Sequence, residues 1–134
     1  MRKSLDTGIR VKESELVEGL AGFLSGQGYK IRTEVPSLGQ SADVVATRGR
    51  WVTFIEVKVS DWQRAFQQCS AHSLVADYIC IALGTKNISE AVRQGAIDRG
   101  IGLIHVSTNS PCTWVVRPTL NTAIWKPQRK QLSQ

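Results

Sequence analysis

Three residues with side chains suited to divalent-cation chemistry lie close together in the first half of the sequence. Asp43 stands near the start of one apolar segment, and Glu56 and Lys58 stand near the end of the next. Carboxylate oxygens are ligands that Mg²⁺ prefers, and the ion keeps several waters. A lysine beside a metal-bound water can orient that water and help to remove its proton. The three residue types therefore predict a hydrolytic site, provided that the fold brings them together.

Two predicted strands, residues 42–48 and 51–59, carry these side chains. Both segments contain several β-branched residues, and the second also contains Trp51 and Phe54; such residues favour strands. Between them lie Gly49 and Arg50, and a two-residue loop with glycine first is a recognised hairpin connection. The sequence therefore predicts an antiparallel hairpin at this point.

The register of that hairpin decides whether the acidic side chains meet. If Arg48 pairs with Trp51, counting outward along both strands places Asp43 opposite Glu56. Directly opposed residues point to the same face, and two carboxylates so placed repel unless a cation lies between them. Strand alternation puts Lys58 on the face of Glu56. A slip of one residue would turn Asp43 to the other face.

The rest of the chain predicts a mixed sheet flanked by helices. Apolar residues recur at helical spacing in some segments and alternate or run continuously in others. Antiparallel pairing suits the first three strands, and crossover connections suit the later ones. Residues 36–40, with proline, serine and glycine, are predicted to form a loop. The other predicted elements are helices at 13–25, 61–76 and 89–99 and strands at 29–35, 78–83, 101–106 and 113–117.

Composition indicates one soluble domain with a basic surface. The chain has 134 residues, a net charge of +6 and 42% hydrophobic residues, without repeats or a linker, so residues 1–134 are expected to form one domain. From about residue 118 the pattern fades into a basic tail. The sequence has no apolar run that spans a membrane and no apolar signal core, so we expect no membrane partner and a cytoplasmic location. Positive charge attracts polyanions.

The order of Asp43, Glu56 and Lys58 along the chain resembles the motif of the PD-(D/E)XK nuclease superfamily. In that motif an acid opens the second strand and (Asp/Glu)-x-Lys lies on the third, and the matches here are Asp43 and Glu56-Val57-Lys58. The segment Glu13–Val17, followed by Gly28-Tyr29, is similar to the first helix of archaeal Holliday junction resolvases. Together the resemblance covers roughly residues 13–106. Ala42 stands where the motif has proline.

The resemblance implies a restriction-endonuclease-like, three-layer α/β domain with the core order α-β-β-β-α-β-α-β. It also implies Mg²⁺-dependent hydrolysis of DNA phosphodiester bonds, with Mn²⁺ as a substitute. Asp43 and Glu56 would bind the metal, Lys58 would act on the attacking water, and Glu13 would support the metal or the water. The backbone carbonyl of Val57 is a candidate additional ligand.

Two of the supporting residues have a plainer interpretation. Glu13 falls on the apolar stripe of its helix, where a carboxylate needs a partner, but it can equally be a first-turn residue stabilised by the helix dipole. Gln68 matches a glutamine that lies near the site in many superfamily members, on the helix after the lysine strand. The alternative for Gln68 is an ordinary place on the helix surface.

The leading hypothesis is a DNA endonuclease or junction resolvase that acts as a homodimer, because two symmetric cuts call for two sites. The alternatives are a catalytically inactive DNA-binding module of the same fold and a protein-interaction domain in which Glu-x-Lys is a surface ion pair. Basic residues at the hairpin tip and in the tail can contact DNA, but the tip can equally be basic for solubility, and the tail can dock on protein. These residues are Arg48, Arg50, Lys126, Arg129 and Lys130.

Overall fold

The computed structural model describes residues 13–37, 40–69, 75–107 and 111–121, and for Glu13 and residues 34–37 and 40–43 it describes the backbone. Nine elements follow one another in the predicted order: helix, three strands, helix, strand, helix and two strands. They are α1 (Glu13–Ser25), β1 (Lys30–Ser37), β2 (Gln40–Arg48), β3 (Trp51–Lys58), α2 (Trp62–Cys69), β4 (Tyr78–Leu83), α3 (Glu90–Arg99), β5 (Gly102–His105) and β6 (Thr113–Val116).

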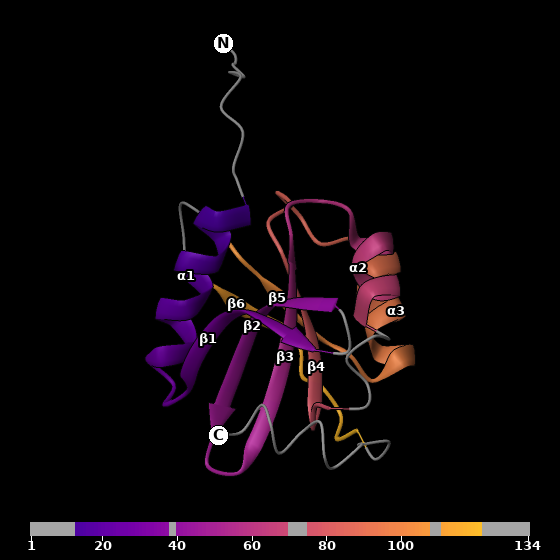
Figure 1. Cartoon of the computed structure of the whole chain (residues 1–134). Helices are drawn as coiled ribbons and strands as arrows, with labels where there is room; N and C mark the ends of the chain where they lie inside the picture. The colour runs from indigo at the N-terminus through magenta and orange to yellow at the C-terminus, as the bar shows by residue number, and fades with distance from the viewer. Residues whose placement is uncertain (1–12, 38–39, 70–74, 108–110, 122–134) are drawn as a thin grey trace.

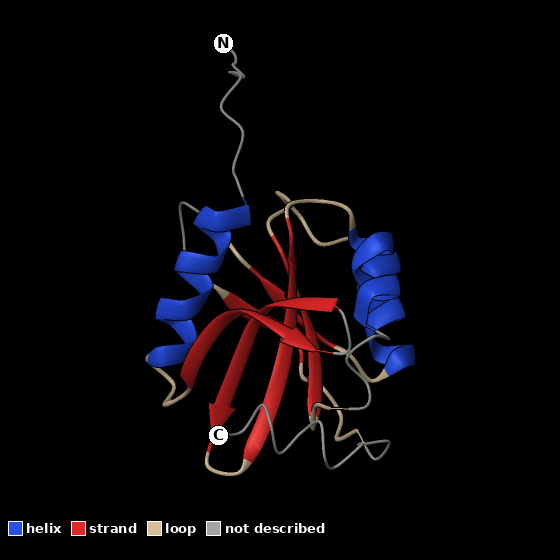
Figure 2. Ribbon diagram, viewed as in Figure 1, coloured by secondary structure: helices blue, strands red, loops and turns tan. Residues whose placement is uncertain are grey.

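The six strands form one mixed sheet in the order β1-β2-β3-β4-β5-β6. β1, β2 and β3 are antiparallel neighbours, β3, β4 and β5 are parallel, and β6 is antiparallel to β5. Helix α1 covers one face of the sheet, and α2 and α3 lie together on the other (Figure 1). Figure 2 shows the same three layers by element type. The predicted α/β fold with helices flanking a mixed sheet is confirmed.

The β2–β3 hairpin has the predicted register. Arg48 pairs with Trp51, and the pairing continues to Val44 opposite Ile55. Gly49, the first loop residue, has φ of 61°, a conformation that glycine adopts without the steric penalty of a Cβ atom. The turn chemistry therefore fixes which residues of β2 and β3 face each other.

Alternate residues of β3 belong to different cores, as the period of a strand requires. Ile55 and Val57 are buried against α1. Phe54 is buried on the opposite face with Val75 and Ala76, and further along that face the sheet packs against α2 and α3. Every residue from position 52 to 57 is buried, so β3 is the central strand of the molecule.

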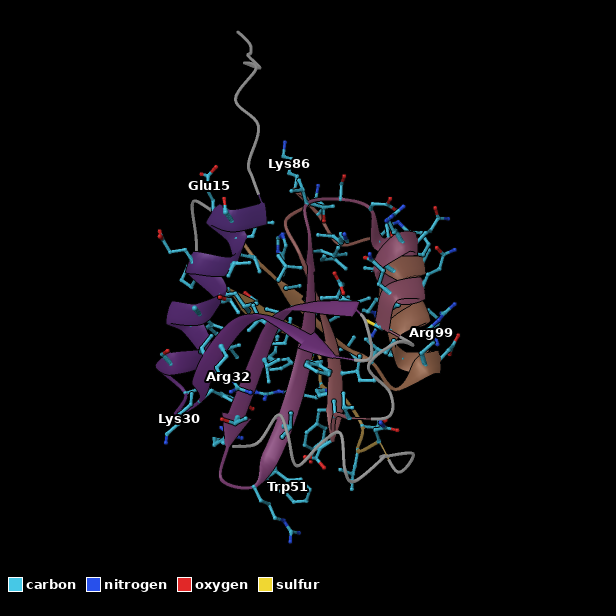
Figure 3. The ribbon with its side chains drawn as sticks, viewed as in Figure 1. Glu15, Lys30, Arg32, Trp51, Lys86 and Arg99 are labelled. Atoms are coloured by element: carbon cyan, nitrogen blue, oxygen red, sulfur yellow. The ribbon has the colours of Figure 1, made fainter. Side chains whose placement is uncertain are left out.

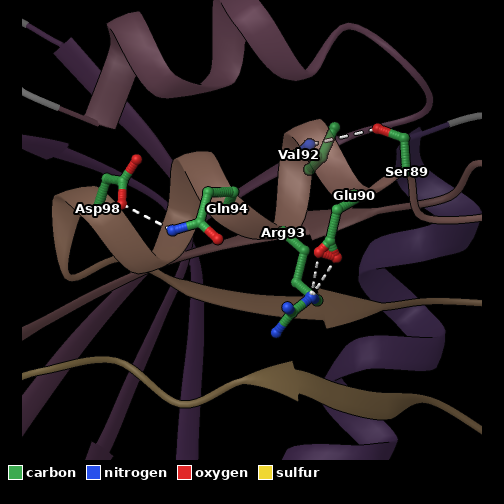
Figure 4. Close-up of polar contacts among 6 residues, drawn as sticks. All are labelled: Ser89, Glu90, Val92, Arg93, Gln94 and Asp98. Carbon is green, nitrogen blue, oxygen red and sulfur yellow. Dashed lines mark hydrogen bonds and ion pairs between the residues drawn. The ribbon is translucent and has the colours of Figure 1, made fainter.

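Local capping signals set the helix ends near the site. The backbone N–H of Arg64 donates to Asp61 Oδ1 at 3.1 Å, so Asp61 caps α2. Ser89 caps α3 by accepting from the Val92 N–H. Figure 4 shows this cap, the Glu90–Arg93 ion pair at 2.9 Å and the Gln94–Asp98 hydrogen bond at 2.8 Å.

The predicted helix over 61–76 is wrong at its end. α2 ends at Cys69, residues 70–74 lie outside the described residues, and the chain at Val75 and Ala76 is no longer helical. The Asp77 N–H donates to the Val52 carbonyl at 2.8 Å, and the Val52 N–H donates to Asp77 Oδ2 at 2.7 Å. These two bonds tie the chain to β3 before β4 begins.

The predicted loop over 36–40 is also wrong where the structure describes it. β1 continues to Ser37 and β2 begins at Gln40, with Pro36 paired to Ser41. Proline lacks an N–H, but β1 is an edge strand of the sheet, where a missing donor is tolerated.

No helix among the described residues is long and apolar enough to cross a membrane.

Candidate active site and nucleic-acid surface

Glu56 is a buried carboxylate near the end of β3. It is 5% exposed and pairs with Ile81 of β4. It lies on the α2 side of the sheet, because its neighbours Ile55 and Val57 face α1. Burial raises the pKa of the Cys69 thiol on α2 to about 12, and the Glu56 charge adds to this rise. The Glu56 carboxylate therefore lies near Cys69 of α2.

Lys58 shares the face of Glu56 and is the last residue of β3. It is half-buried, and its backbone carbonyl accepts from the Gly84 N–H at 3.0 Å. The acid–lysine pair thus runs from the interior of the sheet to its edge. Carboxylate and ammonium lie on one face, as the strand period predicts, and Lys58 reaches the solvent that Glu56 does not.

Asp43 precedes Val44 in β2, and Glu56 follows Ile55 in β3. The described pairing of the hairpin extends to Val44 and Ile55, and the Asp43 side chain lies outside what the structure describes. That the Asp43 and Glu56 carboxylates meet therefore stays a prediction. Among the side chains described, no group of three His, Cys, Asp or Glu residues could hold a metal ion, and Asp43 is not one of those side chains.

The start of α1 lies at the end of the sheet where β3 ends. Figure 3 shows Glu15, of the first turn of α1, and Lys86, which follows β4, at one end of the molecule and Trp51 at the other. The contact of Gly84 with Lys58 joins the end of β4 to the end of β3. Glu13, the first residue of α1, belongs to the same end, and its side chain lies outside the described part.

Gln68 has a buried side-chain oxygen that accepts no hydrogen bond from the described residues. On the same helix Phe66 faces α3, with the Arg99 guanidinium 4.6 Å above its ring. Because a helix turns about 100° per residue, Gln68 lies about 200° from Phe66, on the flank away from α3. A buried acceptor without a donor costs about 1–3 kcal/mol, so this oxygen is a candidate for binding a cation or a substrate proton donor.

A basic groove lies on the sheet face that also carries Glu56. Its volume is about 540 Å³. Lys30 pairs with Thr47 and Arg32 with Val45, and directly paired residues point to one face. Figure 3 labels both side chains on β1. The lining residues are Gly28, Lys30, Ile31, Arg32, Val45, Thr47, Arg48, Gly49, Arg50 and Val52.

The sequence analysis did not single out Lys30 and Arg32, which line the basic groove, whereas it named the two hairpin arginines as candidate DNA contacts. Arg48 and Arg50 are exposed and border the basic groove. The sequence signal that could have identified Lys30 and Arg32 is their spacing of two residues on β1, which puts both side chains on one face of the sheet. Of the predicted tail contacts, Lys126, Arg129 and Lys130 lie outside the described residues.

Comparison with known proteins gives the fold and leaves the chemistry open. No protein-family model matches the sequence, and no curated protein does. The solved structure of SPO1766, a protein of unknown function from Silicibacter pomeroyi, has a TM-score of 0.70 at 19% identity, over 92% of this chain and 83% of that one. AF1548, also of unknown function, has a TM-score of 0.56 at 23% identity, over 67% and 57%.

A third structure, SfsA of Pyrococcus furiosus in complex with Ca²⁺, has a TM-score of 0.42 at 11% identity, over 78% of this chain and 60% of that one. A TM-score of this size does not establish that the two chains share a fold. The similarity to SPO1766 and AF1548 is a similarity of fold, and fold by itself does not fix an activity.

Proposed function

We propose that this chain is a Mg²⁺-dependent DNA nuclease of the restriction-endonuclease-like class. Asp43 and Glu56 bind the metal, and Lys58 acts on the attacking water. The observation that carries the proposal is the β2–β3 register, with Val44 opposite Ile55. If the same register continues by one pair, Asp43 would stand opposite Glu56, and directly opposed residues have Cβ atoms about 4.5–5.5 Å apart.

The donor set suits a hard divalent cation. Two carboxylates, the Val57 carbonyl and the unsatisfied Gln68 oxygen are all oxygen ligands, as Mg²⁺ requires, and Mn²⁺ accepts the same set. A cation beside Glu56, which is buried, offsets part of the cost of taking its charge out of water. Glu13, at the same end of the sheet, adds a further carboxylate to the metal or to the water.

When bound, Mg²⁺ lowers the pKa of a coordinated water and stabilises the charge that develops on the phosphate. Burial of Glu56 on the α2 side of the sheet limits the orientations of its carboxylate, which would preorganise its oxygens for the metal. Lys58, at the mouth of the site, donates hydrogen bonds that orient the attacking water toward the scissile phosphate. Its ammonium charge also offsets negative charge on the phosphate oxygens.

The basic groove gives a path for the DNA backbone toward these residues. Arg32 is paired with Val45, two residues along β2 from Asp43, which is a separation of about 7 Å along the strand. Lys30 and Arg50 extend the positive charge toward the hairpin. One domain of this size covers a short stretch of duplex, so we propose that two copies act together as a homodimer to make paired cuts.

The test is cleavage of plasmid and branched DNA with Mg²⁺ or Mn²⁺. We expect Glu56→Gln, Asp43→Asn and Lys58→Ala each to lower the rate by about two orders of magnitude or more, as loss of a single electrostatic stabiliser does. Glu90→Gln is the matched control, because Glu90 is an exposed carboxylate on α3. Calorimetric titration with Mg²⁺ should show weaker binding in the two acid variants and unchanged binding in the control.

Three outcomes would contradict the proposal. Wild-type cleavage in Glu56→Gln and Lys58→Ala would exclude the mechanism. DNA binding without cleavage in either metal would favour the inactive DNA-binding module. Absence of any salt-dependent DNA binding would favour a protein-interaction domain.

A further inference from the structure

A second pocket lies on the other face of the sheet from Glu56. Its volume is about 250 Å³. Thr53 belongs to its lining and to the row of β3 residues that faces α1 with Ile55. Trp51 places it at the hairpin end, far from the start of α1 (Figure 3). The lining residues are Tyr29, Arg48, Trp51, Thr53, Tyr78, Trp114, Arg117 and Pro118.

Aromatic side chains are concentrated in this pocket. Both tyrosines and two of the four tryptophans of the chain line it. All four rings are half-buried, so part of each ring remains accessible at the pocket. Trp51 and Tyr78 lie 6.0 Å apart between ring centroids, tilted by 59°. Arginine guanidinium groups lie over one face of three of these rings, Tyr29, Trp51 and Trp114, so a planar ligand would stack on Tyr78 or on a ring face that no guanidinium covers.

Two arginines give the pocket a positive charge. Arg48 lies 4.4 Å above the Tyr29 ring, and Arg117 lies 4.5 Å above the Trp114 ring. The Gln27 carbonyl accepts from Arg48 Nη1 at 3.1 Å, and the Gln27 side chain accepts from Trp114 Nε1 at 3.3 Å. Gln27 therefore positions two lining residues of the pocket, Arg48 and Trp114. Fixed guanidinium groups disfavour a cationic ligand and favour a planar ligand that carries negative charge.

We propose that this pocket binds one unstacked nucleobase of a single-stranded DNA segment, with the adjoining phosphates on Arg48 and Arg117. Its volume is below the ~300 Å³ at which pockets for drug-sized ligands begin, so it suits one base and not a duplex. Arg48 also lines the basic groove on the other face. A strand that leaves the groove can therefore pass around the hairpin edge and place a base in the pocket.

This inference rests on the DNA-binding part of the proposed function and names its substrate class, which is duplex DNA with an unpaired extension or branch. It does not depend on cleavage. The stacking of a base on an aromatic side chain is worth about 1–3 kcal/mol, or on the order of 5- to 150-fold in affinity. The pocket should therefore add a measurable preference for unpaired ends.

The experiment compares the affinity of the whole chain for a blunt duplex and for the same duplex with a short oligo-dT extension, in EDTA to prevent cutting. We expect the wild type to bind the extended duplex at least about 5-fold more tightly. Trp51→Leu should lose this preference and keep its affinity for the blunt duplex. Trp62→Leu is the matched control, since Trp62 is a half-buried tryptophan on α2 and should retain the preference.

Photo-crosslinking with 5-bromodeoxyuridine in the extension provides a second readout. Mass spectrometry should map the crosslink to Trp51, Trp114 or a pocket tyrosine and not to Trp62. Equal wild-type affinity for the two duplexes, an unchanged preference in Trp51→Leu, or a crosslink elsewhere would each overturn the inference. If Glu56→Gln cuts normally but the preference holds, the proposed metal site at Glu56 fails and the pocket proposal stands.

Discussion

At the scale of single residues, the buried side-chain oxygen of Gln68 should lower the stability of the metal-free protein, and the same oxygen is a candidate metal ligand. Its buried oxygen accepts no hydrogen bond from the described residues, and a buried acceptor of this kind costs about 1–3 kcal/mol. Replacing the amide with an apolar side chain of similar length removes that cost. The same replacement removes an oxygen that the proposed metal site would use.

We therefore predict that Gln68→Met stabilises the metal-free protein by about 1 kcal/mol and reduces the stabilisation that Mg²⁺ adds. Thermal unfolding with and without Mg²⁺ measures both effects. Gln63→Met, at an exposed position of α2, is the control and should change neither. A lower melting temperature without Mg²⁺ together with an undiminished Mg²⁺ effect would show that Gln68 serves packing alone.

The buried thiols predict a loss of stability in alkali. Burial, with a contribution from Glu56, raises the pKa of Cys69 from 9.0 to about 12, and burial raises that of Cys80 as well. Above pH 9 the unfolded chain releases a thiol proton that the folded chain retains, so the free energy of unfolding falls as pH rises from about 9 to 12. Each thiol contributes a slope that is about half-maximal near pH 9 and approaches about 1.4 kcal/mol per pH unit above it, with little contribution below about pH 8.

Urea denaturation at a series of pH values above 9 measures that slope. We expect Cys69→Ala to unfold with a shallower pH dependence than the wild type, after allowance for its lower stability at neutral pH. Cys112→Ala is the comparison: burial raises the pKa of Cys112 as well, but Cys112 is only half-buried whereas Cys69 is buried, so its removal should flatten the slope less. Identical slopes in Cys69→Ala and the wild type would contradict the prediction.

Sequence reasoning identified part of the site because strand periodicity is a local property. Glu56 shares a face with Phe54 and opposes the face of Ile55, as alternation predicted. Lys30 and Arg32 could not be recognised as groove residues from the sequence, because basic residues on a strand are typical of a solvent-exposed face until the pairing partner of the strand is known. Their place beside Val45 and Thr47 depends on tertiary contacts that the sequence does not display.

At the scale of elements, boundaries were predictable wherever a local signal ends the element. α1 has the predicted bounds, 13–25, and β4 has the predicted bounds, 78–83. Ser89 and Gly100 cap α3 where the sequence indicated. The end of α2 was not predictable, because the bonds between Asp77 and Val52 join positions far apart in the chain.

Glycines in two elements should respond to alanine in opposite directions. A Cβ atom at Gly102, in β5, would lie 2.6 Å from Cys80 Sγ and 2.8 Å from Pro118 Cδ, so Gly102→Ala should destabilise the protein by about 1–3 kcal/mol through overpacking. At Gly22, in α1, nothing lies within 4 Å, so Gly22→Ala should stabilise it by about 0.5–1 kcal/mol. Urea denaturation of both variants checks the sign. A stable Gly102→Ala variant would mean that β4 and β5 pack less closely than these distances require.

At the scale of the whole molecule, the sheet separates two kinds of surface. The face under α2 carries Glu56, Lys58 and the basic groove, and the face under α1 carries the aromatic pocket. Arg48, at the end of β2, lines both, so the hairpin is the place where the two surfaces join. A net charge of +6 would attract a polyanion to the molecule as a whole, and under the proposed function these two surfaces would determine where DNA binds.

The salt dependence of DNA binding tests whether the basic groove carries the phosphate backbone. Each phosphate contact releases counterions, so the logarithm of the binding constant falls with the logarithm of salt concentration by roughly one per contact. Lys30→Ala combined with Arg32→Ala should therefore reduce the magnitude of that slope by about two. Affinity should fall by similar factors for unrelated duplex sequences, because phosphate contacts do not read bases.

The matched control is Arg64→Ala combined with Arg93→Ala, which removes the same charge from exposed positions of α2 and α3. Lost long-range attraction alone would weaken binding equally in the two double variants, because their net charges are the same. Direct contact in the groove instead makes the slope fall only in the β1 variant, because counterions are released only where phosphates are neutralised. Equal slopes in the two variants would mean that the basic groove is not the path of the DNA, and the proposed approach of the scissile phosphate would fail with it.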